Sequence, residues 1–185
     1  MKKPLKKTVV FLLCILCGLA VSYVLWCQFR GGPSGVPNFH RVSSKLYRGG
    51  QPTAEGMKNL REMGIRTIIN LRWFHSDRDE IGDTQLRYHH ITFNPLHPED
   101  KEVVRFLKIV ANRSNQPVFV HCTYGSDRTG MMCALYRVAV QGWTKERAIA
   151  EWANGGFGFH DAYQNLLYYF RQLDIEEMKL QAGLN

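Results

Sequence analysis

The stretch that decides the fold is PVFVHCTYGSDRTGMMCALYRVAV, residues 117 to 140. It begins with a β-branched and aromatic run typical of a buried strand and ends in a pattern typical of an amphipathic helix. The loop between them, residues 121 to 130, therefore lies at a helix N-terminus. Unpaired backbone N–H groups and the positive end of the helix dipole favour an anion there, and Gly125 permits the backbone angles that a cradle requires.

Two side chains of this loop, Cys122 and Arg128, determine what it can bind and react with. Arg128 adds a guanidinium, which fits a tetrahedral oxyanion such as phosphate. The same positive field stabilises a thiolate, because helix N-termini and nearby cations lower a cysteine pKa from about 8.5 to between roughly 3.5 and 7.5. We therefore expect Cys122 to be a nucleophile at neutral pH. The loop predicts binding of a phosphate monoester and attack on its phosphorus.

The motif His-Cys-x-x-Gly-x-x-Arg-Thr-Gly, residues 121 to 130, resembles the signature loop of the cysteine-dependent protein tyrosine and dual-specificity phosphatases. The flanking text LYRGGQPTAEGMKNLREMGIRTIINLR (46–72) and GFGFH (156–160) is similar to small bacterial dual-specificity-like members. The likeness covers about residues 39 to 175. It implies a metal-free phosphatase that works without a cofactor. The sequence contains no H-E-x-x-H, and its one C-x-x-C, Cys14 to Cys17, lies in an uncharged apolar run, where cysteine is typically an apolar residue and not a metal ligand.

The resemblance also implies roles for individual residues. Cys122 would form a phosphocysteine, and Thr129 would assist the thiolate when water cleaves that intermediate. His121 would tune the thiolate, although a polar residue that simply ends a strand is an equally good interpretation. The phosphoryl oxygens would be held by Arg128 and by the backbone of the loop. The substrate-binding residues implied are Thr123, Tyr124, Gly125, Ser126, Asp127 and Arg128.

The general acid is left open by the sequence. The family supplies an aspartate after the strand preceding the signature strand, but here the run YHHITF (88–93) is followed by Asn94. Glu99 and Asp100 are candidates, although acids in the first turn of a helix also serve the helix dipole. Asp127 is the rival. A similar Asp-Arg-Thr run occurs in myotubularin-like and Sac-type lipid phosphatases, where the aspartate is assigned as the acid.

Other residues near these motifs have two interpretations each. Arg72 either attracts phosphate or is a solvated charge, and Asn70 either braces the loop or caps a turn. The segment GGFGFHD (155–161) either forms the rim of the site or is a turn between helices with aromatic packing. Cys133, about one and a half turns into the helix, is expected in the core.

The whole pattern predicts an α/β domain of the cysteine-phosphatase type. Strands separated by helices indicate a mostly parallel sheet of four to five strands, flanked by helices. Strand patterns occupy residues 45–49, 66–72, 88–93 and 117–121, and helix patterns occupy residues 53–64, 98–113, 128–142, 144–156 and 160–181. Thr53 and Thr144 are expected as helix N-caps.

Residues 9 to 27 contain no charge. As a helix rising about 1.5 Å per residue, this run spans roughly the 30 Å hydrocarbon layer. We predict a transmembrane helix over residues 9–29, preceded by a basic segment, 1–8, and followed by a linker, 30–38, and a phosphatase domain, 39–185. A cleaved signal peptide is the alternative, but the run exceeds the usual apolar region and no A-x-A site follows it.

The distribution of charge bears on location and partners. Four lysines precede the apolar run and only Arg30 closely follows it, so the positive-inside rule places the N-terminus in the cytoplasm and the catalytic domain outside it. Of the formal net charge of +8, the first thirty residues carry five units, which leaves +3 on the remainder. This mild excess gives nucleic-acid binding little support.

Three functions remain open from the sequence. The first is a membrane-anchored phosphatase that hydrolyses phosphate monoesters such as phosphotyrosine or phosphoserine and phosphothreonine. The second is a lipid phosphate phosphatase at the membrane surface. The third is a catalytically weak protein that binds phosphate without turnover, because the loop aspartate is missing. The expected partner is a phosphorylated protein or a small or lipid phosphate monoester, and the oligomeric state is undetermined.

Overall fold

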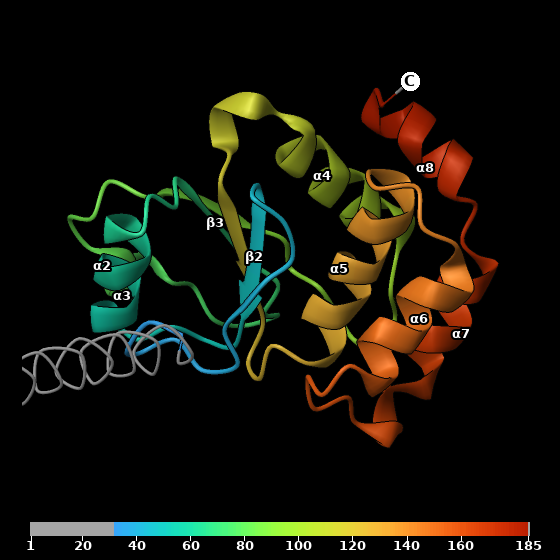
Figure 1. The fold of residues 1–185 in the computed structure, drawn as a ribbon, viewed down its shortest axis with the longest axis horizontal. Helices are drawn as coiled ribbons and strands as arrows, with labels where there is room; N and C mark the ends of the chain where they lie inside the picture. The colour runs from blue at the N-terminus through green and yellow to red at the C-terminus, as the bar shows by residue number, and fades with distance from the viewer. Residues whose placement is uncertain (1–31, 185) are drawn as a thin grey trace, which may run out of the picture. The chain divides into compact units, whose positions relative to one another are not determined.

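The computed structural model describes residues 32–184. Five strands form one sheet in the order β1-β2-β5-β3-β4 (Figure 1). Strand β1 pairs antiparallel with β2, and the other three neighbouring pairs are parallel. The predicted α/β fold with a mostly parallel sheet of four to five strands is confirmed. The strands are β1 (His40–Arg41), β2 (Leu46–Gly49), β3 (Thr67–Asn70), β4 (Arg87–His90) and β5 (Val118–His121).

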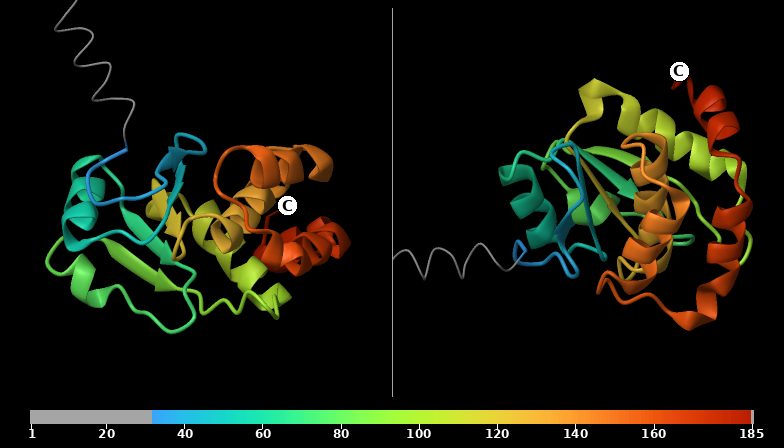
Figure 2. Two further views of the ribbon diagram at one scale, coloured as in Figure 1. Left: turned by 90° about the horizontal axis from the view of Figure 1, so that it is seen from below. Right: turned by 45° about the vertical axis from the view of Figure 1, so that its right-hand side comes forward.

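Helices cover both faces of this sheet. Figures 1 and 2 show α2 and α3 on one side of the strands, and α5, α6 and α7 on the other. The helices are α2 (Ala54–Glu62), α3 (Arg78–Ile81), α4 (Asp100–Ala111), α5 (Asp127–Ala139), α6 (Lys145–Asn154), α7 (Gln164–Gln172) and α8 (Ile175–Ala182), with 3-10 turns at Arg113–Asn115 and Asp161–Tyr163.

The alternation of side chains along the central strands produces two cores. Ile68 and Phe119 belong to the cluster shared with α2 and α3. Their neighbours Ile69 and Val120 belong to the larger cluster shared with α4 to α8. Successive residues of a strand point to opposite faces, so a continuous apolar run is required where both faces are covered. The buried central strands hold the loop that follows β5 in a fixed position.

The sequence predicted two helix starts correctly and missed one division of a helix. Thr53 accepts a hydrogen bond from the Gly56 N–H at 3.1 Å and Thr144 accepts one from the Arg147 N–H at 3.3 Å, which confirms both N-caps. The single helix expected over residues 160–181 is instead divided. The first part, α7, ends at Gln172, and Asp174 caps α8 by accepting from the Glu177 N–H at 3.1 Å, because an aspartate competes for the backbone and favours a helix start.

Residues 33 to 38, expected at the end of a linker, pack onto the domain. Val36 is 6% exposed and belongs to the core beside α2. The carbonyl of Gly35 accepts from the Thr53 N–H at 2.9 Å, and the carbonyl of Pro37 accepts from the Gly50 N–H at 2.7 Å. These contacts position the chain that precedes β1 next to the turn that follows β2.

The predicted transmembrane helix over residues 9–29 lies outside the described residues. Within residues 32–184, no helix is both long and apolar enough to cross a bilayer. The 13-residue helix α5 falls well short of the roughly 20 residues that a span requires. This finding contradicts the predicted single-pass localisation with an extracytoplasmic catalytic domain, and membrane attachment forms no part of the function proposed below.

Candidate active site

The loop of residues 122 to 126 joins the central strand β5 to α5. In the register of the sheet, the last residue of β5, His121, lies beside Gly49 at the end of β2 and Asn70 at the end of β3. The carboxyl ends of these parallel strands meet at one edge, where open α/β sheets bind their ligands. The segments that follow β2 and β3 therefore surround the loop.

The carbonyl groups of the loop are turned away from its interior. The Thr123 carbonyl accepts from the Gln51 N–H at 3.1 Å, and the Tyr124 carbonyl accepts from Asn38 Nδ2 at 3.0 Å. The Gly125 carbonyl accepts from Arg48 Nη2 at 2.6 Å. Because a trans peptide is planar, the N–H of each following residue points the opposite way, into the loop.

The N–H groups of the loop form an unfilled set of donors. Among residues 32–184, none of the backbone N–H groups from Thr123 to Arg128 donates a hydrogen bond to the protein. Six donors at the start of a helix make a binding site for an anion. The predicted cradle is therefore present in the geometry of the loop.

Gly125 is required by both its backbone angle and its packing. Its φ of +77° lies in the left-handed region that favours glycine. A Cβ at this position would overlap the backbone of Gly49 and Gly50. The close approach of these segments is what allows Arg48 and Gln51 to reach the loop carbonyls.

Arg128 and Thr123 line a cleft of about 290 Å³ at the mouth of the loop. Arg128 Nη1 donates to the Leu71 carbonyl at 3.2 Å, and its Nη2 donates to Thr123 Oγ1 at 3.3 Å. The remaining lining residues come from the segment after β3: Arg72, Trp73, Phe74 and His75. Cys122 is only 2% exposed and lies in the hydrophobic cluster, so its sulfur is shielded from bulk water.

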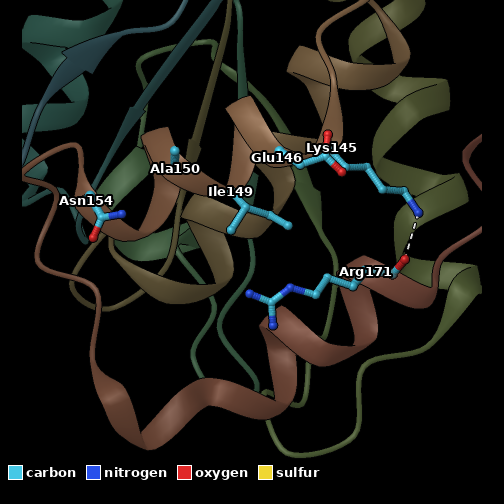
Figure 3. Close-up of a pocket in the computed structure, with 6 residues that line it drawn as sticks. All are labelled: Lys145, Glu146, Ile149, Ala150, Asn154 and Arg171. Carbon is cyan, nitrogen blue, oxygen red and sulfur yellow. Dashed lines mark hydrogen bonds between the residues drawn. The ribbon is translucent and has the colours of Figure 1, made fainter.

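A larger cavity of about 490 Å³ lies between α6 and α7 (Figure 3). Its lining residues are Lys145, Glu146, Ile149, Ala150, Asn154 and Arg171. Lys145 is held there by hydrogen bonds from Nζ to the carbonyls of Arg171 at 2.9 Å and Leu173 at 2.6 Å. No residue of the loop lines this cavity. We assign the candidate active site to the smaller cleft, which Thr123 and Arg128 of the loop line.

His121 is held by a carboxylate that the sequence did not reveal. His121 Nε2 donates to Asp77 Oδ2 at 2.7 Å, and its Nδ1 lies 3.3 Å from the Cys122 carbonyl oxygen. Burial raises the pKa of Asp77, but hydrogen bonds from His121 and Gln51 and the charge of His121 outweigh burial and hold it below the ordinary value. Asp77 is thus an ionised residue that contacts His121, the neighbour of Cys122 in the chain.

Asn70 completes this network. Its Nδ2 donates to Asp77 Oδ1 at 2.9 Å, and its Oδ1 accepts from the Arg72 N–H at 2.7 Å. Asn70 therefore braces the residue that holds His121, as one of its two interpretations anticipated. Arg72 lies in the cleft and donates from Nη1 to Gln51 Oε1 at 3.0 Å, so its charge faces the entrance to the site.

Thr129 is fully buried, and its Oγ1 has no hydrogen-bond partner among the described residues. A buried hydroxyl without a partner is destabilising by about 1–3 kcal/mol. Such a group is suited to a partner that is charged only during the reaction. This is the environment expected of a hydroxyl that assists a leaving thiolate.

Asp127 is 5% exposed and uses both carboxylate oxygens. Oδ1 accepts from the His160 N–H at 2.9 Å and Oδ2 accepts from His160 Nδ1 at 2.8 Å. The pairing explains how an acid is tolerated beside Arg128 in an anion cradle. It also fastens the segment 155–161 to the loop, which supports its interpretation as the rim of the site.

The other acid candidates are bound elsewhere. Glu99 Oε2 lies 2.7 Å from Lys101 Nζ, and Asp100 Oδ1 accepts from the Tyr169 hydroxyl at 2.6 Å. Within the described chain, neither side chain forms a hydrogen bond with residues 121–130. Cys133 is in the core as expected, where burial raises the pKa of its thiol to about 11.

One group in the described residues has ligand atoms close enough to hold a metal ion. The ligand atoms of His75, Asp77 and Glu80 lie within 4.8 Å of one another. Both Asp77 oxygens already accept hydrogen bonds, and Glu80 Oε1 lies 2.9 Å from His75 Nε2. The hydrogen bonds account for this arrangement, and we assign no metal to it.

Comparisons with known proteins agree with this geometry. The family described as "DSP-PTPase phosphatase fused to NAD+ Kinase" matches residues 33–165. Dual specificity protein phosphatase TpbA of Pseudomonas aeruginosa is 32% identical over 144 residues, a match that covers 77% of this chain and 66% of TpbA. The chain thus spans just under two thirds of the length of that relative.

Solved structures show the same fold. The crystal structure of P. aeruginosa TpbA in complex with pTyr has a TM-score of 0.73 and 30% identity, covering 84% of this chain and 94% of that one. The catalytic core of the PP-IP phosphatase SIW14 from S. cerevisiae has a TM-score of 0.70 at 24% identity, covering 81% and 94%, a likeness that shows the fold alone. The chain belongs to the DSP-PTPase family of cysteine-dependent phosphatases.

Proposed function

We propose that this protein hydrolyses phosphate monoesters through a phosphocysteine formed on Cys122. The observation that carries the proposal is the loop after β5, in which the carbonyls are turned outward and the N–H groups of residues 123–128 are left free for an anion. Arg128 adds a guanidinium to these donors at the cleft. Membership of the family supports the same chemistry.

In the first step, the loop and Arg128 hold the three non-bridging oxygens of the phosphoryl group. The Cys122 thiolate attacks phosphorus, an S–P bond forms, and the bond from phosphorus to the leaving oxygen breaks. A general acid transfers a proton to that oxygen. In the second step, water attacks the phosphocysteine and releases inorganic phosphate. The Thr129 hydroxyl donates to the departing thiolate.

We assign the general acid to Asp127. Asp127 is itself a residue of the cradle, whereas Glu99 and Asp100 are bound at the start of α4. Asp127 Oδ2 and His160 Nδ1 lie 2.8 Å apart, so His160 holds the carboxyl in place and links it to solvent. His160 is about half exposed, which keeps the pair in contact with water.

The cleft favours a phosphate on an aromatic ring, such as phosphotyrosine in a protein. Trp73 and Phe74 stack at 4.5 Å between ring centroids, and Phe74 is 87% exposed beside the cleft. Tyr124, 66% exposed, adds an aromatic surface on the loop itself. Aromatic pairs of this kind contribute binding energy beyond the area that they bury. The complex of TpbA with pTyr supports the assignment.

A second candidate function is the binding of phosphate monoesters with only slow hydrolysis. It is favoured by Asn94, which stands after β4 where the family supplies an aspartate, and by the low exposure of Cys122. Such a protein would retain substrate without releasing the alcohol.

The experiment that separates the two uses the full chain with p-nitrophenyl phosphate and a phosphotyrosine peptide, in EDTA, beside Cys122→Ser. We expect release of phosphate by the unmodified protein and none by the variant. Binding of the peptide without a burst of product would establish the second candidate. Activity that persists in Cys122→Ser would overturn the phosphocysteine mechanism. Lipid phosphate monoesters in the same assay test the breadth of the substrate class.

A further inference from the structure

Arg48 is a buried cation at the back of the active-site loop. It lies in β2, where it pairs in register with Val120 of β5 and His40 of β1. Its side chain is 2% exposed. Arginine is almost never fully buried unless its charge is paired, because removing a charge from water is unfavourable.

No acid neutralises this charge. Within residues 32–184, no carboxylate oxygen lies within 4.0 Å of the Arg48 guanidinium. Glu151 lines the same small void as Arg48, but both its oxygens are bound to Arg137, at 2.7 and 2.8 Å. Arg48 Nε is also buried without a hydrogen-bond partner. The fold therefore retains an unpaired positive charge in its interior.

Two groups contact the guanidinium. Nη2 donates to the Gly125 carbonyl at 2.6 Å, and the Phe157 ring lies 3.9 Å from the guanidinium carbon. The hydrogen bond fixes the peptide between Gly125 and Ser126 with its carbonyl toward Arg48 and its N–H toward the cradle. A cation on the carbonyl side polarises this peptide and strengthens the N–H as a donor.

The field of Arg48 acts on neighbours around the loop. Burial lowers the pKa of His40, and the charge of Arg48 lowers it further. Burial raises the pKa of Cys133, and the charge of Arg48 opposes that rise.

We propose that Arg48 is a positioning residue and the second guanidinium of the site, which stabilises a doubly charged oxyanion in the cradle through the Gly125–Ser126 peptide. The inference deepens the proposed function, since the anion would be the phosphoryl group of the substrate. Arg128 contacts the anion from the cleft, and Arg48 acts on it from behind. A dianion should gain more from Arg48 than a monoanion of the same shape, because Coulomb energy scales with the product of the charges.

The test measures binding of tungstate, a dianion, and perrhenate, a monoanion of nearly the same size and shape, by calorimetry at pH 7.5. The full chain carries Cys122→Ser, so neither turnover nor the thiolate contributes. In Arg48→Gln, which keeps a donor near the Gly125 carbonyl but no charge, we expect tungstate affinity to fall about tenfold or more, and perrhenate affinity by about the square root of that factor. Arg48→Lys should keep tungstate affinity within about threefold.

The matched control is the double variant Arg137→Met/Glu151→Gln, which removes the neighbouring ion pair and leaves the net charge unchanged. It should lower affinity for the two anions by equal factors, if at all. Equal losses of tungstate and perrhenate affinity in Arg48→Gln, or equal losses in Arg48→Gln and Arg48→Lys, would overturn the role of Arg48. If Arg48→Gln does not fold, Arg48→Lys is compared with the chain that carries Cys122→Ser alone. A loss of tungstate affinity beyond tenfold in Arg48→Lys, without a matching loss of perrhenate affinity, contradicts a role for charge alone.

These outcomes are independent of turnover. If the unmodified protein hydrolyses no phosphate ester but the charge-dependent loss is found, the proposed function fails and the role of Arg48 stands. If hydrolysis is found but the charge-dependent loss is not, the proposed function stands and the role of Arg48 fails.

Discussion

His121 and Asp77 lie 2.7 Å apart through Nε2 and Oδ2, and neither side chain is exposed to solvent. The pair joins His121, the last residue of β5 and the one before Cys122, to the segment that follows β3. Since Asp77 also accepts from Asn70 and Gln51, one buried carboxylate fixes the ends of β3 and β5 and the segment after β2 against each other. The position of Cys122 depends on this contact.

Asp77→Asn should lower the free energy of unfolding by about 3–5 kcal/mol at neutral pH, because it removes one partner of a buried ionic pair. The folded pKa of Asp77 is below its ordinary value, so its carboxylate stabilises the fold above the unfolded pKa of about 3.9. That contribution is lost as pH falls through the lower folded pKa. Urea unfolding of both proteins from pH 7 to pH 3 should show the difference shrinking in acid, and a constant difference would contradict this role.

Gly125→Ala should abolish phosphate binding and lower stability by about 2–4 kcal/mol, through strain at positive φ and overlap with Gly49 and Gly50. Gly142→Ala is the matched control, because Gly142 also has a positive φ of +69° but has open space around its Cβ. The free energy of unfolding of Gly142→Ala should fall by about 1 kcal/mol, and its activity should be unchanged. Thermal unfolding and hydrolysis of p-nitrophenyl phosphate measure both, and equal effects would rule out the packing argument.

Asp127→Asn should slow hydrolysis of alkyl phosphates much more than that of aryl phosphates, since a good leaving group needs little protonation. The measurement is kcat/KM over a series of leaving groups of rising pKa. A steeper dependence on leaving-group pKa in the variant is expected. Equal slowing across the series would move the acid to another residue.

Thr129→Val should slow the second step about tenfold or more, because the Cys122 thiolate then leaves phosphorus without a hydroxyl donor. Phosphoenzyme should accumulate under steady-state turnover. Stability should not fall, since Thr129 Oγ1 has no partner among the described residues and a methyl group fills the same space. Rapid-quench kinetics test the predicted slowing of the second step, and thermal unfolding tests the predicted unchanged stability. Loss of stability with unchanged turnover would contradict both predictions.

Phe74→Ala should raise KM for a phosphotyrosine peptide several-fold and leave kcat for p-nitrophenyl phosphate nearly unchanged. Phe74 is 87% exposed beside the cleft, so its removal affects contacts with the substrate and not the core. Tyr168→Ala removes another exposed aromatic ring, one that does not line the cleft, and serves as the control. A similar change in both variants would show that the Trp73–Phe74 stack is not part of the substrate site.

The sequence revealed the parts of the site that are local in the chain. A strand, a loop with Cys122 and Arg128, and a helix follow one another over 24 residues, and their patterns are readable without knowing the fold. Arg48 and Asp77 contact the loop only because parallel pairing brings the ends of β2 and β3 beside β5. Such long-range contacts leave no local pattern, and Asp77 stands in a charged run, HSDRDE (75–80), that looks like a solvated turn.

The sequence left the general acid open for the same reason, because a long-range contact leaves no local pattern. Asp127 and His160 are 33 positions apart, and their pairing depends on the packing of the segment 155–161 against the loop. The division of the helix expected over residues 160–181 at Asp174 is a local feature, but its apolar spacing continues across the break. Apolar periodicity predicts which face is buried better than it predicts where a helix ends.

The most direct test of the central claim is the mass of the protein after rapid acid quench during turnover of p-nitrophenyl phosphate, followed by peptide mapping. We expect one added phosphoryl group, located on the peptide that contains Cys122 and absent from Cys122→Ser. Turnover without any phosphorylated Cys122, in the unmodified protein or in Thr129→Val, would contradict the covalent mechanism.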